Sequence, residues 1–129
     1  MADDPKLAVQ GLNEALAQAS EVLGPAQPVA DRSKLVQLAS QAPVVRLVDK
    51  ILLEAVNRRA SDIHVEAFEH HVQVRYRIDG RCYQVAQPPA SLALALSSRL
   101  KVVSNLDVAE SRLPQDGRIL LSVGQRQID

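Results

Sequence analysis

The chain has 129 residues, 47% of them hydrophobic, which is enough for one domain with a buried core. Its 15 basic and 15 acidic residues cancel and only 2% of its residues are aromatic, which argues against a nucleic-acid partner. The single cysteine, Cys82, has no disulfide partner in the chain, and no apolar run approaches the ~18 residues of a membrane span, so we expect a cytoplasmic protein with no direct membrane span.

The first predicted element is an amphipathic helix that ends at residue 23, within an N-terminal unit of residues 1–23. Its apolar residues recur at helical spacing from residue 7 onward: Leu12, Leu16, Ala19 and Leu23. Gly24 and Pro25 end the pattern, and the small and polar residues that follow predict a linker over residues 24–42. The acidic residues near the N-terminus do not fit a signal peptide, which carries basic residues there.

The strongest helical pattern covers residues 43–59. Pro43 fits the first helical turn, and one face of the helix is apolar: Val44, Leu47, Val48, Ile51, Leu52, Ala55 and Val56. Charged residues occupy the other face, so we expect the apolar face to pack on a sheet. The alternation in the next segments predicts that Leu47 and Leu52 are buried together with Val74 and Ile78.

Three strands are predicted after this helix. Apolar and polar residues alternate over residues 62–66 and again over 72–78, which is typical of half-buried strands. Asp79 and Gly80 then predict a two-residue hairpin turn, because a tight hairpin requires positive φ angles that glycine adopts without steric cost. Residues 81–85 are expected to return antiparallel.

A second helix is predicted from Leu92 to near Asn105, with Ser91 as its N-cap. A turn over residues 113–117 precedes a strand that starts at Ile119. The segment 126–129 resembles the start of a returning strand, and we interpret the end of the sequence there as a truncation. The expected fold is a two-layer α/β domain over residues 43–129, with a mainly antiparallel sheet, helices on one face, and the additional N-terminal helix.

Three segments together resemble one known family, the type II secretion and type IV pilus assembly ATPases. They are APVVRLVDKILLEAVNRRASDIHVEAFE at residues 42–69, VQVRYRIDG at residues 72–80 and SRLKVVSNLDVAESRLPQDGRI at residues 98–119. The most specific parts are ASDIHVE, RYRIDG and RLPQDGR, each in the family's order and separation. In that family the matched region is a PAS-like second N-terminal domain that precedes a RecA-like nucleotide-binding core.

The resemblance implies a module without catalytic residues of its own, in a hexameric cytoplasmic ATPase that powers secretion or pilus assembly. The sequence contains no GxxxxGK[ST] motif, so it has neither the ring of backbone N–H groups nor the lysine that bind the phosphates of ATP. We therefore expect no enzyme activity, cofactor or nucleotide ligand in this chain, whereas ATP and Mg²⁺ belong to the parent protein. Its expected partners are adjacent subunits, the RecA-like core and inner-membrane platform proteins, through which it would associate peripherally with the inner membrane.

Five residues are predicted to form interfaces. Arg75 and Arg77 cluster near the Asp79-Gly80 hairpin, and the arginine fork suits carboxylates or phosphates at a subunit contact. Arg112, Asp116 and Arg118 flank Pro114 and Gly117 in a stiff turn. The alternatives are a solvated strand face for the first pair and bracing within the domain for the other three residues.

Two further groups have ordinary interpretations. Asp62, His64 and Glu66 project from one face of a strand and could form a metal triplet, but a polar strand face explains them as well, and we expect no metal site. Cys82 is expected to act as a small apolar side chain.

Two other functions remain open. A PAS-like domain that stands alone could bind a small ligand between helix and sheet, and a cavity at that place would favour this function. Alternatively, residues 7–23 could lay their apolar face into a partner's groove. We found no family match for residues 1–41.

Overall fold

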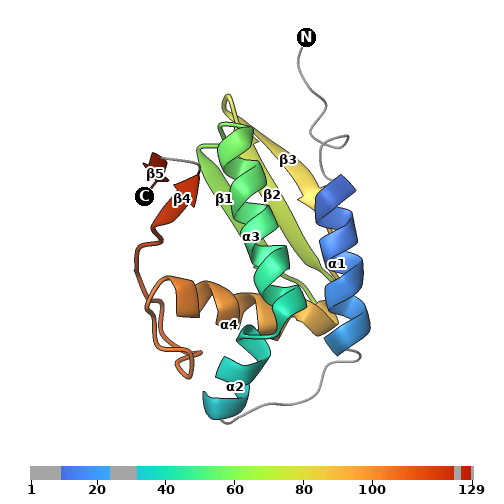
Figure 1. The fold of residues 1–129 in the computed structure, drawn as a ribbon, viewed down its shortest axis with the longest axis vertical. Coiled ribbons are helices and arrows are strands. Elements are labelled where there is room, and N and C mark those ends of the chain that lie inside the picture. The colour runs from blue at the N-terminus through green and yellow to red at the C-terminus, as the bar shows by residue number, and fades with distance from the viewer. Residues whose placement is uncertain (1–9, 24–31, 124–125, 129) are drawn as a thin grey trace.

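The computed structural model describes residues 10–23, 32–123 and 126–128. Helices and strands occur in this order: α1 (Gln10–Leu23), α2 (Arg32–Ala39), α3 (Ala42–Asn57), β1 (Asp62–Ala67), β2 (Val72–Ile78), β3 (Arg81–Ala86), the 3₁₀ helix η2 (Ala90–Leu92), α4 (Ala93–Val103), β4 (Leu121–Val123) and β5 (Arg126–Ile128). The chain therefore has the mixed α/β fold that its alternating patterns predict (Figure 1).

Helix α3 begins and ends for local reasons. Pro43 lies in its first turn, where a missing N–H is not needed. At its other end Arg59 has a φ of 57°, and the N–H of Ala60 donates to the carbonyl of Ala55 at 2.9 Å. This is the hydrogen-bond pattern of a Schellman motif, which stops the helix just before β1.

Strands β1, β2 and β3 form an antiparallel sheet in that order. Asp79 and Gly80 have φ angles of 51° and 80°, as the predicted hairpin turn between β2 and β3 requires. The pairing of β2 with β3 shifts register between Val74 and Arg75, which makes a bulge in β3. Strands β4 and β5 pair only with each other among the described strands.

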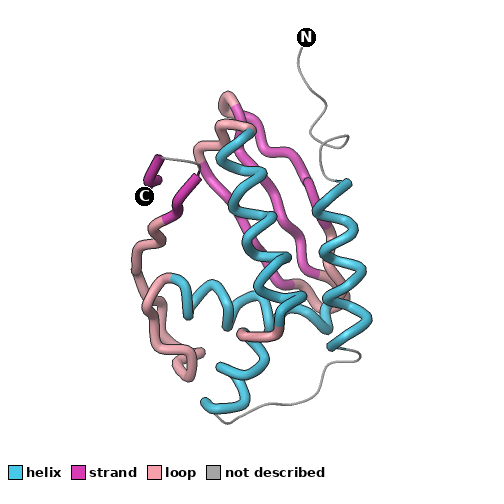
Figure 2. Tube along the Cα trace, in the orientation of Figure 1, coloured by secondary structure: helices cyan, strands magenta, loops and turns pink. Residues whose placement is uncertain are grey.

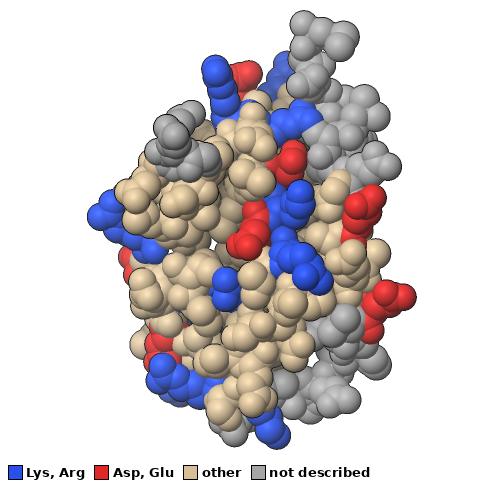
Figure 3. Space-filling view, in the orientation of Figure 1, with Lys and Arg blue, Asp and Glu red and all other residues tan. Residues whose placement is uncertain are grey.

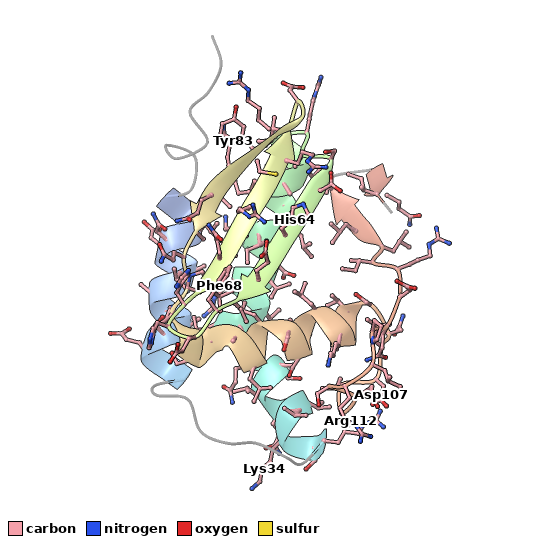
Figure 4. The ribbon with its side chains drawn as sticks, turned by 180° about the vertical axis from the view of Figure 1, so that it is seen from behind. Lys34, His64, Phe68, Tyr83, Asp107 and Arg112 are labelled. Carbon is pink, nitrogen blue, oxygen red and sulfur yellow. The ribbon has the colours of Figure 1, made fainter. Side chains whose placement is uncertain are left out.

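The helices lie on one face of the three-stranded sheet. Helix α3 runs along the sheet with α1 beside it, and α4 crosses one end of the sheet (Figures 1 and 2). Seen from behind, the opposite face of the sheet carries none of the described helices (Figure 4). The fold is thus a two-layer α/β arrangement.

The main core lies between α3, α1 and the sheet. The largest of its fully buried side chains are Tyr76, Leu12, Leu47, Leu92, Leu96, Val48, Val72 and Val74. Leu47, Leu52 and Val74 are buried as predicted, whereas Ile78 is half-buried and packs at the margin of the cluster. Ile78 lies at the end of β2 next to the hairpin turn, so the core covers it on one side only.

Helix α1 belongs to this core. Leu12 and Ala19 are fully buried, and α1 packs against α3 and η2. The apolar face that was considered for binding a partner's groove is therefore covered by the chain's own domain.

The structure corrects three details of the prediction. Residues 32–39, inside the expected linker, form helix α2, whose Leu35 and Ala39 are buried and which packs on α4. Ser91 does not cap α4: it lies inside η2, and the N-cap residue Leu92 makes no side-chain hydrogen bond. The strand expected from Ile119 begins at Leu121. The first two differences arise because a short sequence pattern is a weak guide where tertiary packing determines the local structure.

Candidate interaction surfaces

The sheet face without helices carries alternating polar residues from β1 and β2. Register places Asp62 opposite Arg77 and His64 opposite Arg75. The carboxylate of Glu66 forms an ion pair with Arg75, and Asp62 Oδ2 lies 3.9 Å from Arg77 Nη1. Both predicted interface arginines thus have carboxylate partners within the domain.

These ion pairs also explain the carboxylates of the candidate metal triplet. Asp62 and Glu66 face guanidinium groups, and His64 is paired in register with Arg75. His64 Nε2 and Arg75 Nε are both buried, and neither makes a hydrogen bond to another described residue. Among the residues that the structure describes, no three His, Cys, Asp or Glu side chains are placed to hold a metal ion.

Cys82 and Phe68 are more exposed than apolar side chains usually are. Cys82 was expected to behave as a small apolar residue, but its side chain is exposed, because it stands opposite Arg77 on the uncovered face. Phe68 is also exposed and stacks on His71 with ring centroids 5.0 Å apart.

The segment 106–118 has no regular secondary structure, but hydrogen bonds brace its backbone at several points. Asp107 and Gln115 exchange two hydrogen bonds of 2.9 Å, from the backbone N–H of Asp107 and from the side-chain amide of Gln115. Glu110 Oε1 accepts hydrogen bonds from the backbone N–H groups of Arg112 and Leu113, at 2.8 and 3.0 Å. Lys101 Nζ donates to the carbonyl of Glu110 at 2.6 Å. Side chains of α4 and of the loop itself therefore fix the loop backbone.

Gly117 also locks the loop in place. A Cβ at this position would lie 2.6 Å from the carbonyl oxygen of Ser104 and 2.8 Å from Leu106 Cδ2. Carbon atoms in real structures do not approach so closely, so the close contact between the loop and the end of α4 requires glycine.

Among the described residues, the side chains of Arg112 and Asp116 are not part of the hydrogen bonds that brace this loop. Arg112, Asp116 and Arg118 are all exposed. In the described part of the chain, the side chains of Arg112 and Asp116 have no hydrogen bond or ion pair. Arg118 differs from them, because it does interact with another part of the chain. Leu113, beside Arg112, is 69% exposed. The loop therefore presents charged and apolar side chains outward on a fixed backbone.

The structure does not bring all five predicted interface residues together. Arg75 lies next to His64 on the sheet, whereas Arg112 lies with Asp107 on the far side of α4 (Figure 4). The two sets form separate surfaces: the polar sheet face and the 106–118 loop.

Several hollows lie beside the helices, and two of them differ in the chemistry of their lining. One, of about 310 Å³, lies between α1 and α3 and is lined by Gly11, Glu14, Ala15, Gln18, Arg46, Asp49, Lys50 and Leu53. Its two basic and two acidic residues cancel, and Figure 3 shows charges of both signs interspersed over this side of the molecule. The other, of about 350 Å³, lies between α3, α4 and β1 and is lined by aliphatic residues: Val48, Ile51, Leu52, Ile63, Val65, Leu96, Leu100 and Ile119.

Comparison with known proteins identifies the family. The family model described as Type II/IV secretion system protein matches residues 37–129, which include the sheet, α4 and the loop. The chain belongs to the type II/IV secretion system protein family. No helix among the described residues has both the length and the apolar character to cross a membrane.

Individual relatives of this secretion family member agree with the family match. Type II secretion system protein E of Xanthomonas campestris is 49% identical over 106 residues, which are 82% of this chain and 19% of the relative. Type IV pilus assembly ATPase PilB of Myxococcus xanthus is 52% identical over 91 residues, or 70% of this chain and 16% of the relative. The chain thus spans about a fifth of the length of the relatives that it matches.

A third relative extends the similarity toward the N-terminus. Type II secretion system protein E of Pseudomonas aeruginosa is 44% identical over 126 residues, which are 98% of this chain and 25% of the relative. This match includes α1, so most of residues 1–41, for which the sequence motifs indicate no family, have a counterpart in that relative.

Sequence patterns missed the residues that fix the loop of this secretion family chain. The side chains of Asp107, Glu110 and Gln115 form hydrogen bonds with backbone groups that lie two to eight residues away in the sequence. Acidic and amide side chains in and before the turn over residues 114–117 are a usable signal for such bonds. The partner atoms, however, are set by the path of the chain.

Proposed function

We propose that the chain is a module from the N-terminal region of a secretion or pilus ATPase, and that it is itself non-catalytic. The observation that carries this proposal is the family match over residues 37–129 in a chain about a fifth as long as its relatives. The sequence lacks the phosphate-binding loop, so ATP and Mg²⁺ are assigned to another part of the parent protein.

In the parent, which we take to be a hexameric cytoplasmic motor at the inner membrane, this module would couple ATP hydrolysis to movement between subunits. The 106–118 loop is the surface that we assign to the contact with the nucleotide-binding core. A fixed backbone suits this role, because a loop that is already ordered does not have to be ordered on binding. Arg112 and Asp116 are exposed there and make no ion pair within the described residues, so they are available to a partner.

The sheet face is a weaker candidate for such a contact. Its arginines are already paired with Glu66 and Asp62, and a partner would have to displace these ion pairs. We therefore place Arg75 and Arg77 second to Arg112, Asp116 and Arg118 as contact residues.

The test compares stability of the chain with activity of the parent. Arg112→Ala and Asp116→Ala should leave the melting temperature of the 129-residue chain nearly unchanged and lower the ATPase rate of the parent protein. Glu110→Gln is the comparison variant, since it weakens a side chain that braces the loop and should lower the melting temperature itself. If Arg112→Ala and Asp116→Ala melt the chain, or leave the parent's ATPase rate intact, the loop is not the coupling surface.

A further inference from the structure

The aliphatic pocket between α3, α4 and β1 has no role in the function proposed above. Its floor consists of core residues, among them Val48, Ile51 and Leu96, each at most 3% exposed. Its rim consists of half-buried residues, among them Val65 and Ile119. The pocket thus reaches from the surface into the space between the two layers of the domain.

The pocket is open to the surface, and its volume is large enough for a small molecule. The pocket measures about 350 Å³, whereas an engineered apolar cavity of about 150 Å³ already binds benzene or xenon. Pockets for small molecules start at about 300 Å³, so this one is of sufficient size for a ligand.

The lining determines which chemistry fits. All eight lining side chains are aliphatic, and none can donate or accept a hydrogen bond or carry a charge. A charged or strongly polar molecule would lose its hydration there without compensation. An apolar molecule would exchange water contacts for close contacts with methyl groups on three elements.

We propose that this pocket is a binding site for a small, uncharged, hydrocarbon-like molecule. Such a ligand would join the sheet, α3 and α4 through one set of contacts. Leu100 and Ile119, which stand before and after the 106–118 loop, both line the pocket. Occupancy would therefore also hold the two ends of that loop, and this consequence alone rests on the function proposed for the loop.

Toluene is a suitable probe for the 129-residue chain. Titration followed by methyl NMR should give saturable shifts for Ile51, Ile63 and Ile119, which line the pocket. Leu35 and Val108 are buried elsewhere and should shift little. Shifts that do not saturate, or that are as large at Leu35 and Val108, would show general partitioning and overturn the proposal.

Two filling variants and one matched control make the test specific. Val65→Phe and Leu100→Phe place a ring at the pocket from β1 and from α4, and each should weaken toluene binding about tenfold or more, as expected when a hydrophobic pocket is altered. Leu94→Phe adds the same ring to α4 at a residue that is 37% exposed and does not line the pocket, and it should not change the affinity. Val65→Thr, which keeps the shape and replaces a methyl group by a hydroxyl, should also weaken binding and provides the test if the phenylalanine variants do not fold. Unchanged affinity in the folded pocket variants would refute the site.

Toluene binding to the longer protein that contains this chain distinguishes the two possible occupants of the pocket, a small ligand and a segment of the protein itself. Toluene should bind there with an affinity similar to that for the 129-residue chain. Loss of binding in the longer protein would mean that another part of the protein fills the pocket, and the proposal would be wrong. This result is independent of the Arg112 and Asp116 variants, so the two proposals can fail separately.

Discussion

Tyr76 joins the sheet to α3 by a hydrogen bond as well as by packing. Its hydroxyl donates to the carbonyl oxygen of Ile51, and the residue is fully buried. Burial, and to a smaller extent the negative charge of Glu54, raise the pKa of the Tyr76 phenol above its usual range.

The shifted pKa predicts a loss of stability at high pH. The phenol of unfolded Tyr76 ionises near pH 10, at about its unperturbed pKa, whereas the folded state keeps the proton at higher pH. The stabilisation is therefore complete below about pH 10 and decreases above it, by up to about 1.4 kcal/mol per pH unit. Urea unfolding at pH 8, 10 and 11 should show this decrease in the wild type and a smaller one in Tyr76→Phe. Tyr83→Phe is the control and should retain the wild-type decrease; an identical decrease in both variants would exclude Tyr76 as its source.

Gly117 gives a second prediction for a single residue. Gly117→Ala forces a methyl group against Ser104 and Leu106, and should destabilise the chain by roughly 1–3 kcal/mol, as overpacking does. Gly11→Ala is the matched control. Gly11 lies in α1, and the atom nearest to the added methyl group would be Lys50 Nζ of α3 at 3.8 Å, an ordinary contact distance. Thermal unfolding should show a lower melting temperature for Gly117→Ala and an equal or higher one for Gly11→Ala. Equal melting temperatures for the two variants would contradict the close approach of the loop to α4.

Among the elements, α3 contributes most directly to the contact between layers. Leu47 is fully buried, and Leu53 on the same helix is 37% exposed. Leu47→Ala should lower the free energy of unfolding by about 2–4 kcal/mol, whereas Leu53→Ala should change it by less than about 0.5 kcal/mol. Denaturant titration of both variants measures the difference, and similar losses would mean that the faces of α3 are wrongly assigned.

The arrangement of β1 and β2 explains why the sheet tolerates a face without a helix. Val72, Val74 and Tyr76 face the core, while Arg75 and Arg77 on the other face form cross-strand ion pairs with Glu66 and Asp62 of β1. Pairs of opposite charge on neighbouring strands each contribute roughly 0.2–1 kcal/mol. The polar face is therefore stable as a solvated surface.

At the scale of the whole molecule, the missing phosphate loop leads to a prediction about ATP. The 129-residue chain should neither hydrolyse ATP nor bind it tightly, because it has no GxxxxGK[ST] motif and its net charge is zero. Titration calorimetry and a phosphate-release assay with Mg²⁺ would measure both properties. Micromolar binding, or turnover above that of a sample without protein, would contradict a non-catalytic module.

The sequence by itself determined the elements in which local chemistry and periodicity agree. Helix α3 follows from its apolar stripe and Pro43, and the hairpin between β2 and β3 follows from alternation and the Asp79-Gly80 turn. In these segments the same residues favour the local conformation and form the buried face, so neighbouring residues suffice to predict both. The family could also be predicted, because its motifs RYRIDG and RLPQDGR are local strings of residues.

Only the tertiary structure decided which surfaces are covered. The short helix α2 has a weak pattern and is stabilised by packing on α4, and the apolar face of α1 finds its partner in α3, far along the chain. The sequence placed arginines on the sheet and in the loop alike. The structure paired the first set with carboxylates on a neighbouring strand and left Arg112 and Asp116 exposed, because ion pairing depends on register and chain path rather than on residue type. The pocket has the same origin, since a space between α3, α4 and β1 depends on how three elements meet.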